Sequence, residues 1–492
     1  MNEKHLLGLL FVLPLLVGAY FLNEGLFHYD AIVLAQAVEQ SFETGSVHPA
    51  VNGRYGAVVL TAIVYLPFWL AGKNADVAVR FASVLFYALS IPAAFLFVRK
   101  LFGNVRTGVY AALLFASAPV YSSPNTFGKE HGMALFFVFL SFYFLLKGLQ
   151  DKVPRYLVYS AVVLVASHAV REATLYFLPL YGFLAVCLRS RLSVRDRVLA
   201  VVIPYVAGFM VLYFAYFDAV IAKTLFPAQA GTAYLLPRQE LRALALLSLR
   251  QSTPVLLALA GGFGVVVGVW KKSLPTMFMA AWLLSSFAFF ANISTFAARY
   301  LDVFVFALCV LAAVALAGIP SKYAWAGHMV VAYLCVSSLW MIVPVLSARS
   351  DYNGQVRVGE WIAAHTPDNA VIITQDDAPF VSYYGKRKVL GPPRGELSKS
   401  VEFVRLVSAL IVNKTPVFLT VSGLFDDPDD INKNLFPRYF DFVSNKTILS
   451  EDFHNAEIRQ QRYYQIIWKL GVRSNASQTK PVQRLSVPFH SN

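Results

Sequence analysis

Long apolar segments recur along the first two thirds of the chain, and they constrain its fold more than any other feature. A helix that crosses a membrane needs about 20 mostly apolar residues, and an uninterrupted run of that length is too long for a barrel strand. The sequence therefore predicts a multi-spanning α-helical membrane protein with about 11 transmembrane helices. The expected spans lie at about 6–22, 77–98, 107–122, 131–147, 156–169, 172–188, 198–217, 253–270, 275–293, 300–318 and 324–346.

The composition agrees with a lipid environment. Of the 492 residues, 57% are hydrophobic and only 14% are charged, whereas a soluble domain carries about a quarter charged residues. The formal net charge of +14 does not indicate nucleic acid, because the Lys and Arg residues form short clusters between apolar runs. That pattern is typical of cytoplasmic loops that face anionic lipid. We therefore expect membrane lipids as partners and no nucleic acid.

The stretch 57–72 decides the predicted topology. It is apolar but short for a span, and Pro67 and Lys73 crowd its end. If it crossed the membrane, the basic clusters in 99–106 and 189–197 would lie outside, against the positive-inside rule. We therefore interpret 57–72 as a juxtamembrane or re-entrant helix in the outer interface, with the N-terminus inside. The expected outer segments are 23–56, 122–131, 167–173, 218–252, 294–300 and the chain from about 350 onward.

The character of the chain changes near residue 350. Beyond Asp351 the sequence becomes polar and mixes short strand-like runs at 370–374 and 416–421 with a helical stretch at 354–365. This pattern predicts a small extracytoplasmic α/β domain. The expected divisions are a transmembrane module at 1–349, the α/β domain at 350–472 and a disordered polar tail at 473–492.

Asp30 is the first candidate for a chemical role. The residues after it, AIVLAQAVEQSFET, have the spacing of an amphipathic helix that lies on the membrane. Asp30 takes the N-cap position of this predicted helix, where Asp typically contributes about 1 kcal/mol. It is alternatively the general base of an active site at the membrane surface. Both roles are compatible, because a cap fixes the position of the carboxylate. Glu39 and Glu43 are assigned to the solvated face.

Three further polar clusters interrupt the outer ends of apolar runs. Lys129, Glu130 and His131 precede one span; Glu130 either favours the helix dipole or belongs to a substrate path. Arg171, beside Glu172, either closes a loop as an ion pair or binds a lipid phosphate. Arg299 and Tyr300 open a late span, where an arginine alone is most simply an interface anchor.

Four charged residues of these segments are predicted to lie on one side of the membrane. The predicted topology places Asp30, Glu130, Arg171 and Arg299 on the same outer face. A carboxylate can remove a proton from an acceptor hydroxyl, and arginines can stabilise a departing phosphate. The set therefore suits a reaction between a lipid phosphate and a hydroxyl acceptor.

At these residues the chain resembles the GT-C glycosyltransferases that use a polyprenyl-phosphate sugar, in the subgroup of protein O-mannosyltransferases and the lipid A aminoarabinose transferase. The resemblance rests on HYDAIVLAQAVEQSFETG at 28–45, the block 77–120 with its RKLFG turn, KEHGMALFF at 129–137 and the Arg299-Tyr300 pair. Two positions differ from the family pattern, since Glu130 stands where Asp is more usual and Arg171 where Lys is common.

The resemblance implies an inverting glycosyltransferase that moves a sugar from a polyprenyl phosphate to a glycan, lipid or protein acceptor on the outer face of the membrane. The implied setting is the plasma membrane of a prokaryote, or the endoplasmic reticulum of a eukaryote. The implied candidate catalytic residues are Asp30 and Glu130, the candidate donor-phosphate ligands are Lys129, Arg171 and Arg299, and the candidate substrate-binding residues are His28, Tyr29, His131, Glu172 and Tyr300.

Two alternatives accompany this interpretation. A divalent metal is possible at His28 and Asp30, or at Asp30 with Glu130 and His131, but the first outer loop has no Asp-x-Asp pair, so we expect no essential metal or other cofactor. A polytopic lipid or sugar transporter without transferase activity is the rival function, because transporters also carry intramembrane charges.

Overall fold

The computed structural model describes residues 2–50, 54–187, 192–216, 238–290, 298–351, 353–375, 377–393, 395, 397–425, 431–454 and 460–473. The predicted tail at 473–492 lies outside these residues except for its first position. Most of the predicted outer segments 218–252 and 294–300 also lie outside them. The described chain forms two compact units, which divide between residues 351 and 353.

The first unit is helical. Its helices are α1 (Glu3–Tyr20), α2 (Tyr29–Thr44), α3 (Tyr55–Leu70), α4 (Ala75–Phe102), α5 (Val105–Ala116), α6 (Pro119–Asn125), α7 (His131–Asp151), α8 (Pro154–Val170), α9 (Leu178–Cys187), α10 (Val194–Tyr216), α12 (Arg238–Ser252), α13 (Val255–Trp270), α14 (Leu274–Phe290), α15 (Asp302–Ala317) and α16 (Ala324–Asp351), with short 3₁₀ turns η2 (Glu172–Phe177), η5 (Ala298–Leu301) and η6 (Ser321–Tyr323).

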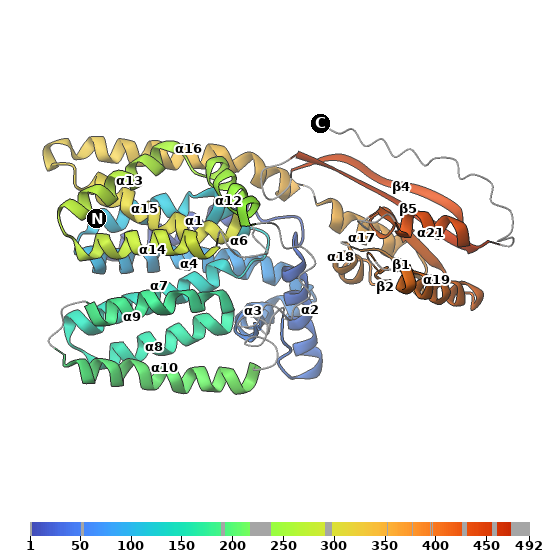
Figure 1. Ribbon diagram of the computed structural model, residues 1–492, viewed down its shortest axis with the longest axis horizontal. Helices are drawn as coiled ribbons and strands as arrows, with labels where there is room; N and C mark the ends of the chain where they lie inside the picture. The colour runs from blue at the N-terminus through green and yellow to red at the C-terminus, as the bar shows by residue number, and fades with distance from the viewer. Residues whose placement is uncertain are drawn as a thin grey trace. The chain divides into compact units, whose positions relative to one another are not determined.

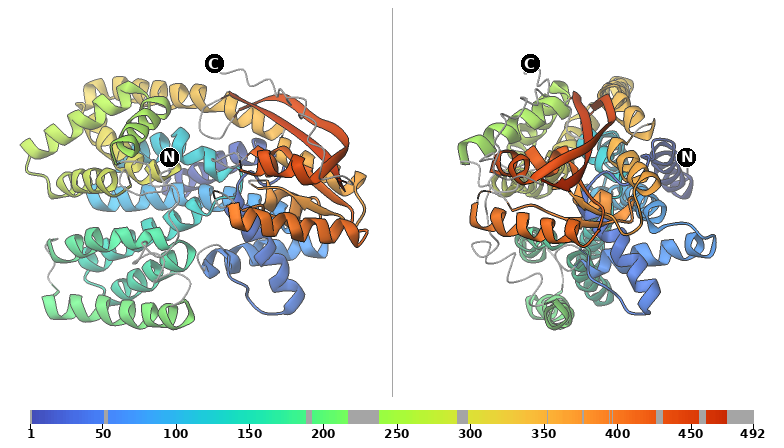
Figure 2. Two further views of the ribbon diagram at one scale, coloured as in Figure 1. Left: turned by 45° about the vertical axis from the view of Figure 1, so that its right-hand side comes forward. Right: turned by 90° about the vertical axis from the view of Figure 1, so that its right-hand side faces the viewer.

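The long helices lie side by side in a bundle (Figure 1). Helix α4 packs against α1, α5 and α7, α7 packs against α8, and α15 packs against α5, α13 and α14. The right-hand view of Figure 2 looks along several of these helices. Helices α2 and α3 run across the bundle direction at one end of it (Figure 1). This orientation is the one expected of juxtamembrane helices, as the sequence predicts for 57–72.

Some predicted spans are broken in the structure. The run 107–122 is two helices, because α5 ends at Ala116 and Pro119 starts α6. Proline has no N–H to donate, so it fits the first turn of a new helix and not the interior of a continuing one. The run 172–188 likewise begins as the 3₁₀ turn η2 before α9.

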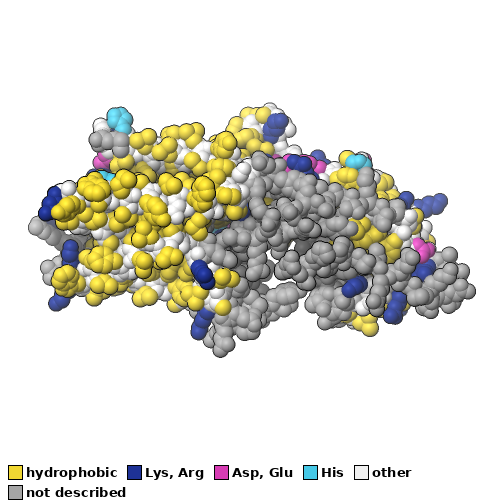
Figure 3. Space-filling view, turned by 90° about the horizontal axis from the view of Figure 1, so that it is seen from above, with side chains coloured by type: hydrophobic (Ala, Val, Ile, Leu, Met, Phe, Trp, Pro, Cys, Tyr) yellow, Lys and Arg dark blue, Asp and Glu magenta, His cyan; other side chains and the backbone are white. Residues whose placement is uncertain are grey.

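Five helical segments in the described part of the chain are long and apolar enough to cross a membrane, namely α1, α4, α7, Arg299–Ala317 and Ser321–Ser347, and further apolar helices are shorter. On the face shown in Figure 3, apolar side chains cover the helical unit and the Lys and Arg side chains there lie near its edges. An apolar surface of this extent requires lipid. The chain is a multi-pass membrane protein, and the count of eleven spans stays a prediction.

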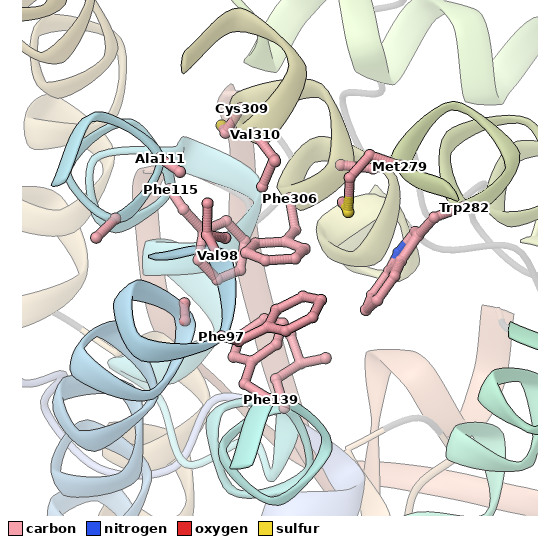
Figure 4. Packing of buried hydrophobic residues seen from close by; sticks show 14 of the residues in the cluster. Phe97, Val98, Ala111, Phe115, Phe139, Met279, Trp282, Phe306, Cys309 and Val310 are labelled. Atoms are coloured by element: carbon pink, nitrogen blue, oxygen red, sulfur yellow. The ribbon is translucent and has the colours of Figure 1, made fainter. Parts of the chain in front are cut away.

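Aromatic side chains fill the centre of the bundle (Figure 4). Phe97 of α4, Phe115 of α5, Phe139 of α7, Trp282 of α14 and Phe306 of α15 are all fully buried there. The ring centroids of Phe139 and Phe306 lie 4.3 Å apart, and those of Phe115 and Phe306 lie 5.0 Å apart. Such tilted and edge-on pairs contribute about 0.5–1.5 kcal/mol each beyond the burial of their area, so this cluster fixes α4, α5, α7, α14 and α15 relative to one another.

The second unit is a five-stranded sheet with helices. In the strand order β2-β1-β3-β5-β4, β1 (Val371–Ile373) pairs in parallel with β2 (Lys388–Leu390) and β3 (Val417–Thr420), while β5 (Gln460–Val472) is antiparallel to β3 and β4 (Phe440–His454). Its helices are α17 (Gly354–His365), α18 (Ala378–Tyr383), α19 (Leu397–Val412), α20 (Val421–Phe425) and α21 (Ile431–Tyr439). Strands β1 and β3 and helix α17 lie at the strand-like and helical stretches expected from the sequence.

Candidate active site

Helix α2 places the candidate base. Its buried face consists of Ala31, Ile32, Leu34, Ala35, Ala37 and Val38, which is the amphipathic pattern predicted. The predicted N-cap is wrong, because His28 is the cap: its Nδ1 accepts a hydrogen bond of 3.1 Å from the Asp30 N–H, and Asp30 lies in the first helical turn. The sequence did not indicate this cap, because Ser, Thr, Asp and Asn are the residues usually found at N-caps and His is not.

The assignment of Glu39 to the solvated face is also wrong. The side chain is half-buried, and its Oε1 accepts a hydrogen bond of 2.9 Å from the Ala75 N–H at the start of α4. A carboxylate at that position satisfies an otherwise unpaired helical N–H and favours the positive end of α4. Glu43 is exposed, as predicted.

The turn before α7 brings Lys129 and Glu130 to Asp30. Gly128 has φ 92°, a conformation that L side chains rarely adopt, and a Cβ on it would lie 2.9 Å from Val79. The turn is fixed further by the Ser83 hydroxyl, which donates to the Lys129 carbonyl. Lys129 Nζ then lies 2.5 Å from Asp30 Oδ2, in a partly buried ion pair.

Arg54 joins three carboxylates from three separate segments, all of them predicted to lie outside. It is the N-cap residue of α3 and is buried. Its Nη1 lies 2.6 Å from Glu130 and 3.6 Å from Asp30, and its Nε and Nη2 donate to both oxygens of Glu172 at 2.9 and 2.8 Å. The planar guanidinium of arginine can make this bidentate contact with a carboxylate, whereas the ammonium group of a lysine cannot.

The charges in this cluster shift its titrations. Burial alone would raise the pKa of Asp30, but Lys129 and Arg54 hold the pKa of its carboxyl well below the ordinary value. The pKa of Glu130 is lowered in the same way, by Arg54 and Lys129 against the effect of burial. Burial lowers the pKa of Lys129 to about 7, although Asp30 and Glu130 oppose that shift. Asp30 is therefore a carboxylate throughout the physiological range, while Lys129 titrates within it.

A chain of contacts leads from Asp30 to the two candidate phosphate ligands. His28 Nε2 lies 3.2 Å from Arg299 Nη2. The guanidinium carbons of Arg299 and Arg171 each lie 5.3 Å from the centroid of the Tyr300 ring, within the range of cation–π attraction. Two cations thus share one aromatic ring next to the carboxylate cluster.

A small cavity lies beside Arg171. Its lining includes Arg171, Tyr300, His131 and Asp302, together with apolar residues of α7 and η2. His131 Nδ1 lies 2.6 Å from Asp302 Oδ2, and both side chains are almost fully buried. The His131 ring is stacked on Tyr300 at an interplanar angle of 12°.

Nine of the ten predicted site residues meet in this cluster. Tyr29 is the exception, since it is half exposed and none of its contacts among the described residues reaches the others. Sequence reasoning missed Arg54 and Asp302. Arg54 lies three residues before the apolar stretch 57–72, and Asp302 lies two residues after Tyr300. Both are charged residues next to an apolar run, and that feature could have identified them.

Within the described residues, no three His, Cys, Asp or Glu side chains are arranged to hold a metal ion. The expectation that no metal is essential stays a prediction, to be tested with a chelator.

The chain is similar to known membrane enzymes. Residues 56–217, from α3 to the end of α10, match the family described as dolichyl-phosphate-mannose-protein mannosyltransferase. Among solved structures, ArnT from Cupriavidus metallidurans bound to undecaprenyl phosphate is similar with a TM-score of 0.60 and 13% identity, over 95% of this chain and 98% of ArnT. The chain has the GT-C fold. The fold expected from that resemblance is thereby confirmed.

Two other GT-C structures are similar over most of this chain. The archaeal oligosaccharyltransferase AglB from Archaeoglobus fulgidus, in complex with an inhibitory peptide and a dolichol-phosphate, has a TM-score of 0.59 and 12% identity, over 85% of this chain and 69% of AglB. The arabinofuranosyltransferase AftD from Mycobacteria has a TM-score of 0.57 and 14% identity, over 95% of this chain but only 40% of AftD. No curated protein sequence matches significantly. Identities this low establish the fold and leave the substrates to be proposed.

Proposed function

We propose that this chain is a membrane glycosyltransferase that moves a sugar from a polyprenyl phosphate to a hydroxyl acceptor, with inversion at the anomeric carbon. The observation that carries the proposal is the continuous set of contacts from Asp30 through His28 and Arg299 to Tyr300 and Arg171. A base at one end and cations at the other are the two groups that such a transfer requires.

Asp30 is the proposed general base. Its side chain is 21% exposed, whereas those of Glu130 and Asp302 are each 4% exposed and that of Glu172 is 12% exposed. An acceptor hydroxyl can therefore reach Asp30 more readily than the other carboxyls. Glu130 is tied to Arg54, and we assign it to the same centre as the group that positions Arg54 near Asp30.

Arg171 and Arg299 are the proposed ligands of the donor phosphate. Two positive charges on one ring repel each other, and an anion near both removes that repulsion. Arg171 is only 7% exposed, and its Nε–H finds no acceptor among the described residues. An unpaired buried donor of this kind costs about 1–3 kcal/mol, which a phosphate oxygen would offset. Lys129, which contacts Asp30, is the third proposed cationic ligand of the donor phosphate.

The proposed step is a single displacement. The acceptor oxygen forms a bond to the anomeric carbon while its proton passes to Asp30, and the bond from that carbon to the phosphate oxygen breaks. The electron pair of the broken bond stays on the polyprenyl phosphate, where the arginines stabilise it. Removal of the proton by a positioned base typically contributes 10²–10⁴-fold, and holding donor and acceptor together contributes further.

The supporting comparisons concern other proteins that bind undecaprenyl phosphate or dolichol phosphate. A transporter is the rival, but it gives no role to a carboxylate that is more exposed than the others of the cluster. We place the reaction at the outer face of a prokaryotic plasma membrane, or at the endoplasmic reticulum of a eukaryote, with a glycan, lipid or protein as acceptor.

The test compares Asp30→Asn with Glu43→Gln, a matched change on the exposed face of the same helix. Purified proteins receive radiolabelled polyprenyl-phosphate sugars and membrane extract as a source of acceptor. We expect Glu43→Gln to transfer sugar at the wild-type rate and Asp30→Asn to lose at least about 100-fold. An Asp30→Asn protein that transfers at the wild-type rate would show that Asp30 is not the base, and a wild type that moves lipid without forming a glycosylated product would favour the transporter.

A further inference from the structure

Asp302 fixes the hydrogen-bonding pattern of His131. The 2.6 Å contact joins His131 Nδ1 to a carboxyl oxygen, and when Asp302 is ionised the proton of this hydrogen bond lies on Nδ1. In the neutral ring the other nitrogen, Nε2, then bears a lone pair. A second proton would add a positive charge beside Arg171 on the same cavity, which like-charge repulsion disfavours. With Asp302 ionised, His131 is therefore an acceptor at Nε2.

Within the described part of the chain, the second ring nitrogen of His131 has no hydrogen-bond partner. Nδ1 is occupied by Asp302, and among the described residues no donor contacts Nε2. The residue lines the small cavity together with Arg171 and Tyr300. Buried acceptors are normally paired, so this one is available to a donor group that enters the cavity.

The cavity limits what can enter. Its volume is about 20 Å³, on a scale where one water needs about 10–15 Å³. This volume matches one hydroxyl group, and a larger substituent would press against the lining residues Phe177 and Phe290, which are 2% and 3% exposed. A single hydroxyl is also the simplest group that donates to a neutral imidazole.

The proposed phosphate-binding arginines indicate which molecule carries that hydroxyl. In a polyprenyl-phosphate sugar the phosphate is bonded to the anomeric carbon, so the sugar atoms nearest the phosphate are those beside that carbon. Arg171 both lies on Tyr300 and lines the cavity. A donor whose phosphate sits at the arginines would therefore bring the substituent next to its anomeric carbon to His131.

We infer that His131, held by Asp302, accepts a hydrogen bond from the hydroxyl beside the anomeric carbon of the donor sugar, and that this contact selects hydroxyl-bearing sugars over their deoxy and acetamido counterparts. The inference rests on the proposed function and narrows its substrate class. Asp302 acts through His131 and is a positioning residue. Its replacement by Asn would allow the imidazole to reverse its tautomer, because an amide can donate as well as accept.

Binding measurements without an acceptor test the inference independently of transfer. The probes are a polyprenyl-phosphate hexose, its 2-deoxy and 2-acetamido counterparts, and polyprenyl phosphate without sugar. For the wild type we expect the hexose donor to bind about tenfold tighter than the deoxy donor, the worth of one well-placed hydrogen bond, and the acetamido donor to bind more weakly still. Asp302→Asn and His131→Phe should reduce the hexose-to-deoxy ratio to about one while polyprenyl phosphate binds as in the wild type.

The outcomes separate the two hypotheses. Equal binding of hexose and deoxy donors to the wild type would overturn the inference, and so would an Asp302→Asn protein that weakens all four probes by the same factor, because that is a structural defect. Asp302→Glu, which retains the carboxylate, should restore part of the ratio. If the wild type discriminates among the donors but transfers none of them to any acceptor, the proposed function fails and the sugar contact stands.

Discussion

Replacing Arg54 by Met is expected to destabilise the outer end of the helical unit severely. The change removes the ion pair with Glu130 at 2.6 Å and both hydrogen bonds to Glu172, while leaving those two carboxylates at 4% and 12% side-chain exposure. Breaking a buried ion pair by removing one partner typically costs about 3–5 kcal/mol, because the other charge stays buried. Lys129 and Arg171 still lie near Glu130, so we expect a total of about 3–5 kcal/mol and not twice that.

The assay measures the free energy of unfolding in detergent, with limited proteolysis as a readout of the outer segments. The triple variant Arg54→Met, Glu130→Gln, Glu172→Gln is the control, because removing both partners of a pair is far less costly than removing one. It should regain most of the lost stability.

The pH dependence of the same variant has a defined sign. The folded-state pKa of Glu130 is lowered, so its ion pair contributes stability that is complete above the ordinary glutamate pKa of about 4.3 and is lost as the pH falls through the folded value. The difference in the free energy of unfolding between the wild type and Arg54→Met should therefore become smaller at acidic pH. A variant within about 1 kcal/mol of the wild type at neutral pH, or a triple variant no better than the single one, would refute the assigned role of Arg54.

Three shorter predictions follow from other parts of the structure. Burial lowers the pKa of Lys129 to about 7, so its charge beside Asp30 is present below that pH and lost above it. At saturating donor the initial rate of transfer should rise as the pH passes through about 7, because Asp30 becomes a stronger base, while the KM for the donor should also rise, because one cation near the phosphate is lost; Lys129→Met should show neither change there. A Cβ at Gly132 would lie 2.7 Å from the backbone nitrogen of Tyr87, so Gly132→Ala should cost about 1–3 kcal/mol in unfolding measurements, whereas Gly182→Ala, with open space around it, should cost nothing. Transfer activity should persist in excess chelator, and its loss and recovery on adding a divalent ion would show that the centre needs a metal.

The sequence predicts the helices well where apolar runs are long and uninterrupted. Helix α7 begins at residue 131 and α13 ends at residue 270, as expected, because both runs end at charged or polar residues. It predicts the break at Pro119 poorly, since the residues on both sides are apolar or small and only the missing N–H ends the helix.

The candidate site was predictable in its members but not in its pairings. Asp30, Glu130, Arg171 and Arg299 could be placed on one face from topology alone, yet Arg54 contacts Glu172 across 118 positions of sequence. Ion pairs between distant segments have no local pattern, and a buried arginine resembles any loop arginine until its partners are known. The prediction of the α2 cap failed because His28 and Asp30, two positions apart, are both able to cap the helix.

Helix α2 contacts the rest of the helical unit through polar side chains at two positions, Asp30 and Glu39. The helical geometry fixes the distance and the angle between these two positions. The first turn of α2 is held by the His28 cap and by the contacts of Asp30, and Glu39 holds the start of α4. Each residue of an α-helix turns the chain by about 100°, so inserting or deleting one residue between these points would swing Glu39 away from Ala75 or swing Asp30 out of the cluster. The length of this segment is therefore under tighter constraint than the identity of its exposed residues, and homologous chains should tolerate substitutions on that face far more readily than a change in residue number.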